Sequence, residues 1–195
     1  MPRVDFDAAY AGIPPWDIGR PQPAFLALTD AGAVRGRVLD VGCGTGEHTL
    51  MCAGLGLDAT GIDLAEKALR AAESKAGERG LSTRFLRHDA RQLADLGQSF
   101  DTVLDCGLFH IFSDEERAAF TAGLHSVVPP GGRYFMLGFS DRQRGEWGRV
   151  RKLRRAEIEA SFADGWRIDS IEPSTIDITT DPDGIRAWLA LFTRS

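Results

Sequence analysis

The sequence predicts an α/β fold with a doubly wound sheet of seven strands, mostly parallel with an antiparallel strand at the C-terminal end. Short apolar segments alternate along the chain with longer segments whose apolar residues recur at helical spacing. Strands separated by helices pair in parallel through right-handed crossovers, so helices cover both faces of the sheet. No helical pattern separates the last two strand-like segments, and we therefore expect an antiparallel hairpin there.

Each element has a local justification in the sequence. The expected strands, which are short and apolar, are residues 37–42, 58–63, 83–89, 100–107, 133–140, 166–173 and 187–195. The expected helices are residues 46–56, 64–80, 113–128 and 155–165. The third of these helices has the clearest start, because Ser113 and Glu116 have the spacing of a capping box. Residues 14–23 (PPWDIGRPQP) carry four prolines, which excludes a helix interior.

Composition limits the class of protein. A chain of 195 residues suits a single domain, which we expect to consist of an N-terminal lid over residues 1–30 and a core over residues 35–195. The net charge of −5 argues against general nucleic-acid binding. The three cysteines form no CxxC pair, so we expect neither disulfides nor a metal site, and a cytoplasmic location. No apolar run predicts a membrane span or a signal peptide.

A glycine-rich loop follows the first expected strand. Gly42, Gly44 and Gly46 give the spacing G-x-G-x-G, which is one residue shorter than the nicotinamide-dinucleotide fingerprint. Glycine permits positive φ angles and lets a ligand approach the backbone closely. Open α/β sheets bind ligands at this end of their strands. The glycines alone are explained equally well by a tight turn before a helix.

Three carboxylates strengthen the interpretation as a ligand site. Asp40 precedes the loop, Asp63 ends the second expected strand, and Asp89 follows the third. A carboxylate at the position of Asp63 can accept hydrogen bonds from both hydroxyls of a ribose. Asp40 would repel a pyrophosphate, so an adenosine that carries an amino-acid tail suits the site better than a dinucleotide.

The chain resembles the class I S-adenosylmethionine-dependent methyltransferases, which have a Rossmann-like fold. The matching segments are VLDVGCGTGEHT, ATGIDLAEKAL, FLRHDARQL, FDTVLDCGLFHIF and LHSVVPPGGRYFMLGFSD, which cover most of residues 37–141. The resemblance implies S-adenosylmethionine as cofactor, S-adenosylhomocysteine as product, and no metal. The cofactor-binding residues that it implies, together with His48 as a positioning residue beside the loop, are Trp16, Asp40, Gly42, Gly44, Gly46, His48, Asp63, Leu64, Asp89, Ala90, Asp105 and Cys106.

The proline-rich segment PPWDIGRPQPAFLAL is similar to a segment of the thiopurine and halide/thiol methyltransferases, and of actinobacterial enzymes that methylate quinones and hydroxyquinolines. That similarity implies a segment that crosses the cofactor and helps to form the acceptor pocket. Proline lowers the entropy cost of ordering such a lid. Trp16 can offer an aromatic face to a sulfonium cation. The alternative is that Trp16 only fills the edge of the sheet.

Candidate catalytic and acceptor-binding residues follow the fourth and fifth expected strands. His110 is the expected general base, because imidazole titrates near neutral pH. Its alternative is a core histidine bonded to the backbone. Phe109, Phe139 and Trp147 are expected to line an apolar acceptor pocket together with His110, and Phe112 is a weaker candidate.

The expected reaction is O- or N-methylation of a small aromatic or heterocyclic acceptor. S-methylation of a small thiol is the alternative. The run 141–155 has seven basic residues against two acidic ones, which leaves RNA methylation open beside a solvated face or a substrate flap. A non-catalytic nucleotide-binding module is a further alternative. The sequence does not determine the accepting atom or the oligomeric state.

Overall fold

The computed structural model describes residues 6–145 and 150–195, so the predicted pocket residue Trp147 lies outside the described residues. The strands are β1 (Arg37–Val41), β2 (Asp58–Asp63), β3 (Arg84–Arg87), β4 (Thr102–Cys106), β5 (Arg133–Phe139), β6 (Trp166–Ile178) and β7 (Asp181–Arg194). The α-helices are α1 (Phe6–Ala9), α2 (Pro23–Asp30), α3 (Glu47–Gly54), α4 (Glu66–Glu78), α5 (Asp114–Val127) and α6 (Arg155–Ser161). Two 3-10 helices are η1 (Ala90–Leu96) and η2 (Phe109–Ile111).

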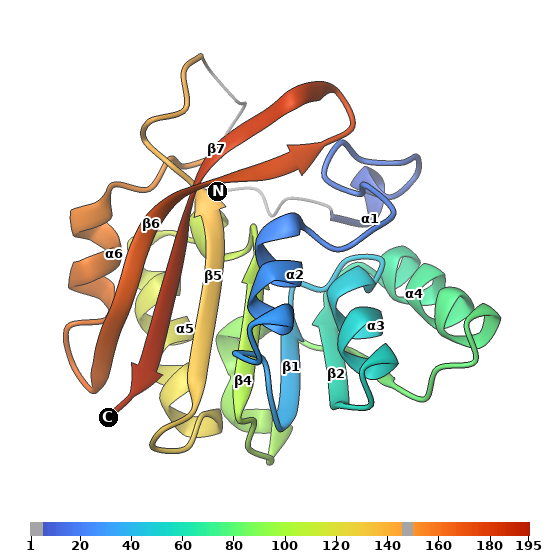
Figure 1. Cartoon of the computed structure of the whole chain (residues 1–195), viewed down its shortest axis with the longest axis horizontal. Helices are drawn as coiled ribbons and strands as arrows, with labels where there is room; N and C mark the ends of the chain where they lie inside the picture. Colours follow the sequence, from blue (N-terminus) through green and yellow to red (C-terminus); the bar gives the residue numbers. More distant parts are fainter. Residues whose placement is uncertain (1–5, 146–149) are drawn as a thin grey trace.

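The seven strands form one sheet in the order β3-β2-β1-β4-β5-β7-β6 (Figure 1). β1 to β5 pair in parallel, and β7 is antiparallel to both of its neighbours. The predicted fold class is therefore confirmed, including the final hairpin. The hairpin is longer than expected, because residues 174–186 continue it beyond both predicted strands. Its tip extends past the end of β5 toward the N-terminal segment (Figure 1).

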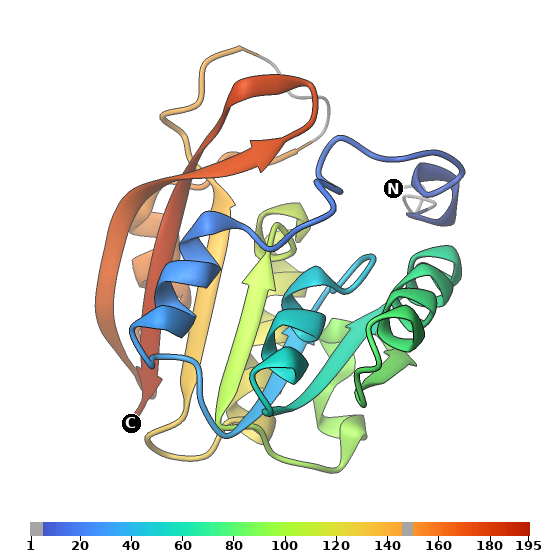
Figure 2. The same ribbon diagram turned by 45° about the vertical axis from the view of Figure 1, so that its right-hand side comes forward.

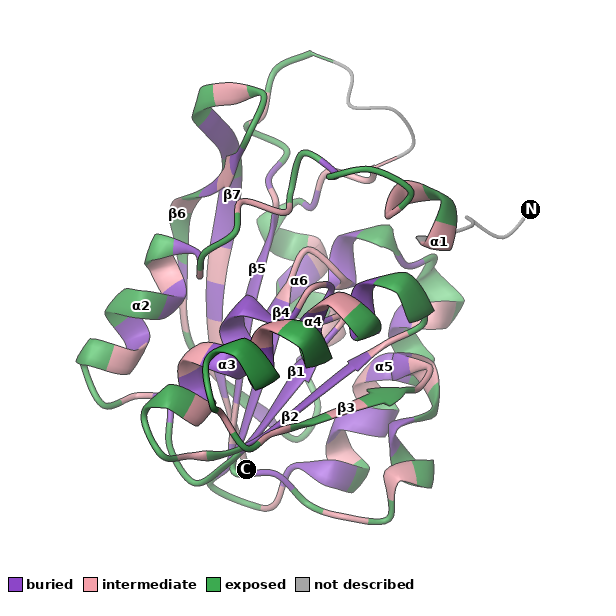
Figure 3. Cartoon of the chain, turned by 90° about the vertical axis from the view of Figure 1, so that its right-hand side faces the viewer, coloured by how far each residue is buried: buried purple, intermediate pink, exposed green. Residues whose placement is uncertain are grey.

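Two apolar layers enclose the sheet. On one face, Phe120 of α5 and Phe162, which directly follows α6, pack against β4 and β5. On the other face, α2 contributes Phe25 and Leu28 to a second cluster with β1, β4 and β5. The strands are mostly buried, whereas the outer sides of the helices are exposed (Figure 3). In the described part of the chain, no helix has the length and apolar character to cross a membrane.

The local sequence explains where two helices begin. α5 starts with the predicted capping box, in which Ser113 and Glu116 each bond the other's backbone N–H. α2 was not predicted, although its first residue is Pro23, and proline is favoured in the first turn of a helix. The preceding residues 14–22 contain no helix, as the prolines predict.

Candidate functional site

The glycine loop between β1 and α3 has the conformation that glycine alone adopts readily. Gly42, Gly44 and Gly46 have φ angles of 67°, 53° and 84°. A Cβ atom on Gly46 would lie 2.8 Å from atoms of Ala72 and Phe85, so a side chain there would collide with the layer behind the loop. A Cβ atom on Gly44 would lie 2.7 Å from the hydroxyl oxygen of Tyr10. Gly46 therefore allows close packing behind the loop, and Gly44 makes room for the hydroxyl group of Tyr10.

Asp63 holds this loop at the end of β2. Its Oδ2 accepts a hydrogen bond from Gly44 N at 2.8 Å, and its Oδ1 accepts one from Ala65 N at 2.8 Å. Burial raises the pKa of the Asp63 carboxyl. A carboxylate oxygen can accept more than one hydrogen bond. Asp63 can therefore hold the loop and still accept hydrogen bonds from the hydroxyls of a ligand.

Asp40 is turned inward from the same edge. It is buried, and its Oδ2 accepts hydrogen bonds from Thr49 N at 3.1 Å and Thr49 Oγ1 at 2.7 Å. It thus satisfies a free N–H group in the first turn of α3. Burial, with a smaller contribution from the carboxylates of Asp63 and Asp105, raises its pKa to about 7, although the hydrogen bonds from Thr49 oppose the shift. The predicted contact of Asp40 with a methionine tail stays a prediction.

Asp105 corrects one expectation. We expected it to contact the cofactor, but its side chain is fully buried. Its oxygens accept from Leu108 N at 2.9 Å, Phe109 N at 3.1 Å and Tyr134 Oη at 2.8 Å. Asp105 therefore fixes the turn that carries η2. Burial also raises the pKa of the half-buried Cys106 thiol, which keeps that thiol neutral.

Asp89, one of the expected cofactor-binding residues, is paired with an arginine. Arg91 pairs with Asp89 through its Nε at 2.9 Å and its Nη2 at 2.5 Å, and with Glu116 through its Nη1 at 2.5 Å. Ala90, buried, begins η1 directly after Asp89. Leu64 is 39% exposed, which leaves its side chain open to an aromatic ring.

The N-terminal strap, residues 10–22, runs across the carboxyl edge of the sheet above the glycine loop (Figure 2). Trp16 Nε1 donates a hydrogen bond to Tyr10 Oη at 3.1 Å, and Asp17 Oδ1 accepts one from Thr45 Oγ1 at 3.0 Å. Trp16 is 51% exposed, which contradicts the alternative in which it only fills the sheet edge. Tyr10 was missed by sequence reasoning, because a lone tyrosine near the chain start carries no motif.

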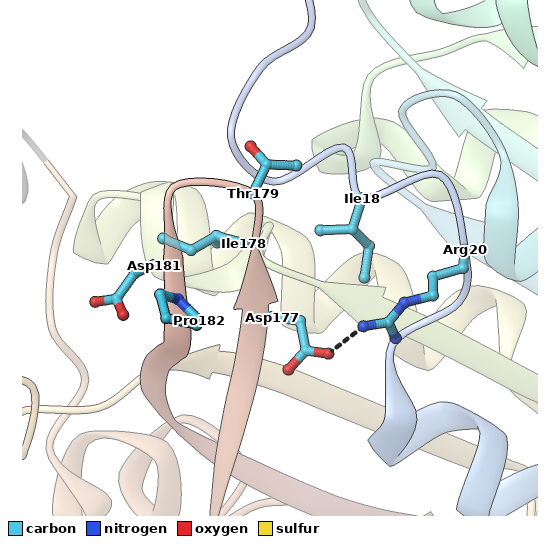
Figure 4. A pocket seen from close by; sticks show the side chains of 7 residues that line it. All are labelled: Ile18, Arg20, Asp177, Ile178, Thr179, Asp181 and Pro182. Atoms are coloured by element: carbon cyan, nitrogen blue, oxygen red, sulfur yellow. Dashed lines mark hydrogen bonds and ion pairs between the residues drawn. The ribbon is translucent and has the colours of Figure 1, made fainter.

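The other end of the strap is fastened to the β6–β7 hairpin. Gln22 Nε2 donates to Asp177 O at 2.9 Å, and Asp177 N donates to Gln22 Oε1 at 2.8 Å. Thr179 N donates to Pro15 O at 2.9 Å. Arg20 and Asp177 form an ion pair at 2.7 Å (Figure 4). The residues that line the open pocket of about 260 Å³ beside this pair are Ile18, Arg20, Asp177, Ile178, Thr179, Asp181 and Pro182.

His48 is buried and holds the strap in position. Its Nε2 accepts a hydrogen bond from Gln22 N at 3.1 Å, and its ring lies edge-on to Phe25 at 4.7 Å. Burial lowers the pKa of His48 to about 4, so the ring is neutral near pH 7. The predicted positioning role is therefore directed at the strap.

His110 lies between the ends of β4 and β5. Its Nδ1 accepts a hydrogen bond from Phe139 N at 3.2 Å, and the two rings lie 4.4 Å apart. Burial, with Arg117 nearby, lowers the pKa of His110 to about 3. Because the Nδ1 lone pair is in use, the neutral ring carries its proton on Nε2. This geometry contradicts the expected general base and realises the backbone-bonded alternative.

The predicted phenylalanines separate into two groups. Phe139 is half-buried beside His110, which suits an apolar pocket wall. Phe109 is fully buried and packs against Phe120 and Phe162, with ring centroids 6.2 Å and 5.6 Å away. Phe112 also belongs to this core cluster. Phe109 therefore supports the turn beneath His110, and its expected contact with an acceptor is corrected to a core role.

The basic run 141–155 is partly neutralised, because Arg151, Arg154 and Arg155 form ion pairs with acidic residues of the described part of the chain. Arg151 bridges Asp114, at 2.6 Å, and Glu157. Arg155 pairs with Glu159 at 2.9 Å. The contacts of Arg151 connect the segment to α5 and α6, whereas the pair of Arg155 with Glu159 lies within α6.

The residues at the loop fit S-adenosylmethionine. The carboxylate of Asp63 contributes to the raised pKa of Asp40 on the neighbouring strand, an effect that a bound cation would oppose. Asp63 suits a ribose, Leu64 an adenine ring, and the backbone at Gly44 a tail that approaches closely. Between residues 6–145 and 150–195, no three potential metal-ligating side chains converge.

Comparison with known proteins supports this reading. A family model described as a methyltransferase domain matches residues 38–132. The chain is 32% identical over 168 residues to the 2-heptyl-1-hydroxyquinolin-4(1H)-one methyltransferase of Mycobacteroides abscessus, covering 85% of this chain and 74% of that protein.

Two solved structures extend the comparison. One, from work on the conversion of a disulfide bond into a thioacetal group during echinomycin biosynthesis, is 37% identical with a TM-score of 0.89 and covers 97% of this chain and 90% of its own. The other is the magnesium protoporphyrin IX methyltransferase of Synechocystis PCC 6803 with bound S-adenosylmethionine. It is 25% identical with a TM-score of 0.69, covering 88% of this chain and 76% of its own. The glycine loop, its carboxylates and these relatives agree that the chain belongs to the class I S-adenosylmethionine-dependent methyltransferases.

Proposed function

We propose that the enzyme transfers a methyl group from S-adenosylmethionine to the oxygen or nitrogen of a small aromatic or heterocyclic acceptor. The observation that carries the proposal is that a polar site and a partly apolar site lie at the same edge of the sheet. Asp63 and the glycine loop lie at the ends of β1 and β2, and the His110–Phe139 pair lies at the ends of β4 and β5. The relative that acts on a hydroxyquinolone, by its name, supports an aromatic acceptor.

The chain's own residues would bind, orient and dehydrate the reactants. When bound, S-adenosylmethionine supplies an electrophilic methyl group on a sulfur that is already a good leaving group. Asp63 and the loop backbone would orient the donor, and the apolar Phe139 would orient a flat acceptor against it. Tyr10 and Trp16 of the strap would exclude water from the two reacting groups. Positioning and desolvation of this kind account for much of the rate of a displacement reaction.

S-methylation of a thiol is the second candidate. It is favoured by the relative that is named for a reaction at sulfur, from a disulfide bond to a thioacetal group. RNA methylation has less support, because Arg151 and Arg155 in the basic run already pair with acidic residues of the same chain. Paired arginines have less charge to offer to phosphates.

The test combines binding and turnover. Calorimetry would measure S-adenosylhomocysteine binding, and release of S-adenosylhomocysteine from S-adenosylmethionine would be assayed with 1-hydroxyquinolin-4-ones, phenols, thiols and a short RNA. We expect binding, and fastest release with a hydroxylated heterocycle. Fastest release with a thiol would favour S-methylation, and with the RNA would favour RNA methylation. Binding without release for any acceptor would contradict the enzyme proposal, and absence of binding would contradict the cofactor site.

A further inference from the structure

We propose that His110 donates a hydrogen bond from Nε2 to an acceptor that enters the site already as an anion, so that the acceptors are hydroxylated heterocycles acidic enough to ionise in water. This inference rests on the proposed methyl transfer and names its substrate class. It replaces a proton-abstracting histidine with a hydrogen-bond donor.

The first step of the argument is the orientation of the imidazole. β4 ends at Cys106, whereas β5 continues to Phe139. At this end of β5, the Nδ1 atom of His110 accepts a hydrogen bond from Phe139 N at 3.2 Å. A neutral imidazole has one donor and one acceptor nitrogen. The second nitrogen, Nε2, is therefore the donor.

The second step is that the Nε2–H group is left for a ligand. No described residue forms a hydrogen bond with it, since the recorded bond of His110 is the one at Nδ1. The described side-chain atoms that are both sealed in and unpartnered belong to Thr60, Arg117 and Trp166. Nε2 of His110 is not among them, so it still reaches open space. A donor in that position is directed at whatever binds beside Phe139.

The third step concerns the two titratable side chains at the end of β4, Asp105 and Cys106, neither of which suits the role of base. The Asp105 carboxylate of β4 is enclosed by Leu108, Phe109 and Tyr134, which all donate to it. The Cys106 thiol is held neutral by burial, which raises its pKa. Neither of these two side chains of β4 is therefore suited to take a proton from an acceptor hydroxyl.

The fourth step is the sign of the nearby charge. Arg117 of α5 is buried, donates from Nε to Phe109 O, and lies 5.0 Å above the Phe109 ring. Its positive charge lowers the pKa of His110, which disfavours an imidazolium. The same charge favours an anion beside the ring. The tautomer and the charge therefore select the same ionic form of the acceptor.

The chemical step then needs no proton transfer. A lone pair on the acceptor oxyanion forms the bond to the methyl carbon. The carbon–sulfur bond breaks, and its electron pair stays on sulfur, which becomes a neutral thioether. The Nε2–H group of His110 orients the oxyanion, and no proton leaves or joins the ring.

The first test uses the protein without any ligand. Nitrogen-15 NMR of the histidine rings would identify the His110 signals by their loss in His110→Asn. We expect the Nε2–H tautomer to persist from pH 5 to 8, because burial keeps the ring neutral. A ring that is protonated on Nδ1, or that titrates within this range, would overturn the proposal whatever the activity of the enzyme.

The second test measures kcat/KM against pH for 1-hydroxyquinolin-4-ones whose hydroxyl pKa values differ. We expect each inflection to follow the pKa of the acceptor, and His110→Gln, which keeps an N–H donor, to retain more activity than His110→Phe. Loss of the donor lowers rates by roughly 100-fold at comparable anion-binding sites. His125→Asn, at the opposite end of α5, is the matched control.

The outcomes are separable. One inflection that is shared by every acceptor and is abolished in His110→Gln would identify a general base and overturn the inference, while the methyltransferase proposal would stand. Turnover of no acceptor, with the Nε2–H tautomer observed, would overturn the proposed function and with it the substrate class.

Discussion

At the two halves of the sheet's carboxyl edge, backbone N–H groups donate to side chains of different charge. On the β1–β2 side, free backbone N–H groups are held by carboxylates, with Asp40 on Thr49 N and Asp63 on Gly44 N. On the β4–β5 side, the backbone N–H group of Phe139 donates to the neutral imidazole of His110. The first arrangement attracts a cation, and the second presents a donor to an anion. The proposed reaction between a sulfonium and an oxyanion would use both arrangements.

The largest expected effect breaks the carboxylate side. Asp63→Ala should weaken S-adenosylhomocysteine binding by roughly 10- to 100-fold, because hydrogen bonds to a charged group contribute about 1.5–3 kcal/mol each. Calorimetry would measure the change. Asp58→Ala, at the exposed amino end of the same strand, is the control and should bind normally. Equal affinity for Asp63→Ala and the parent protein would remove Asp63 from the cofactor site.

The next effect concerns the strap that spans both sides. Gln22→Ala should lower the free energy of unfolding by about 1–3 kcal/mol, because it leaves the backbone N–H and C=O of Asp177 unpaired. Denaturant titration would measure stability, and hydrogen exchange would show faster exchange at Thr179. If the strap excludes water from the reaction, turnover should fall more than cofactor affinity. Unchanged exchange at Thr179 would refute the fastening.

The pH dependence of binding sharpens the contrast between the two sides. Burial raises the pKa of Asp40 and of Asp105 to about 7, from about 4 in the unfolded chain. Both groups are then protonated in the native state but ionised in the unfolded state between these values. Stability from these groups therefore falls as the pH rises from about 4 to about 7, and is constant above that range.

A bound cation favours the ionised carboxylates, so binding should release protons. The affinity for S-adenosylmethionine should rise by about three- to tenfold between pH 6 and pH 8. Calorimetry in buffers of different ionisation enthalpy would count the protons released. Asp40→Asn should reduce that count. Affinity that is flat or falls over this interval would show that the carboxylates do not sense the ligand's charge.

The smallest expected effect is at the surface of the strap. Arg20→Ala removes an ion pair with Asp177 in which the arginine side chain is 54% exposed. Exposed pairs contribute about 0–1 kcal/mol, so stability should change by less than in Gln22→Ala. Thermal unfolding at low and high salt would measure it. A larger loss of stability in Arg20→Ala than in Gln22→Ala would show that the ion pair holds the strap more strongly than the hydrogen bonds of the Gln22 side chain do.

The cofactor side could be predicted from sequence because its signals are local. Gly42, Gly44 and Asp63 stand directly at strand ends, and parallel strands bring such ends together at one edge. The acceptor side could not be predicted in the same way. Asp105 and Phe109 stand at equivalent strand-end positions, yet Tyr134 and Phe162, from other elements, draw them into the core.

Long-range partners account for the remaining misses. Gln22 bonds to Asp177 across 155 residues, and neither residue has a motif that announces the other. The hairpin continues through residues 174–186, and the strap bonds to its tip through Pro15 O and Thr179 N. Contacts of this kind between distant segments are not visible in the local sequence of the hairpin.

The sequence by itself determined the strand ends, the glycine loop and the carboxylates beside it, because backbone freedom and alternating apolar patterns are properties of neighbouring residues. Only the tertiary structure decided which nitrogen of His110 is free, since the N–H group that occupies the other belongs to the end of a different strand. The sequence gives the identity of a side chain, but the nitrogen that carries the proton depends on the hydrogen-bond partner that the folded structure places beside it.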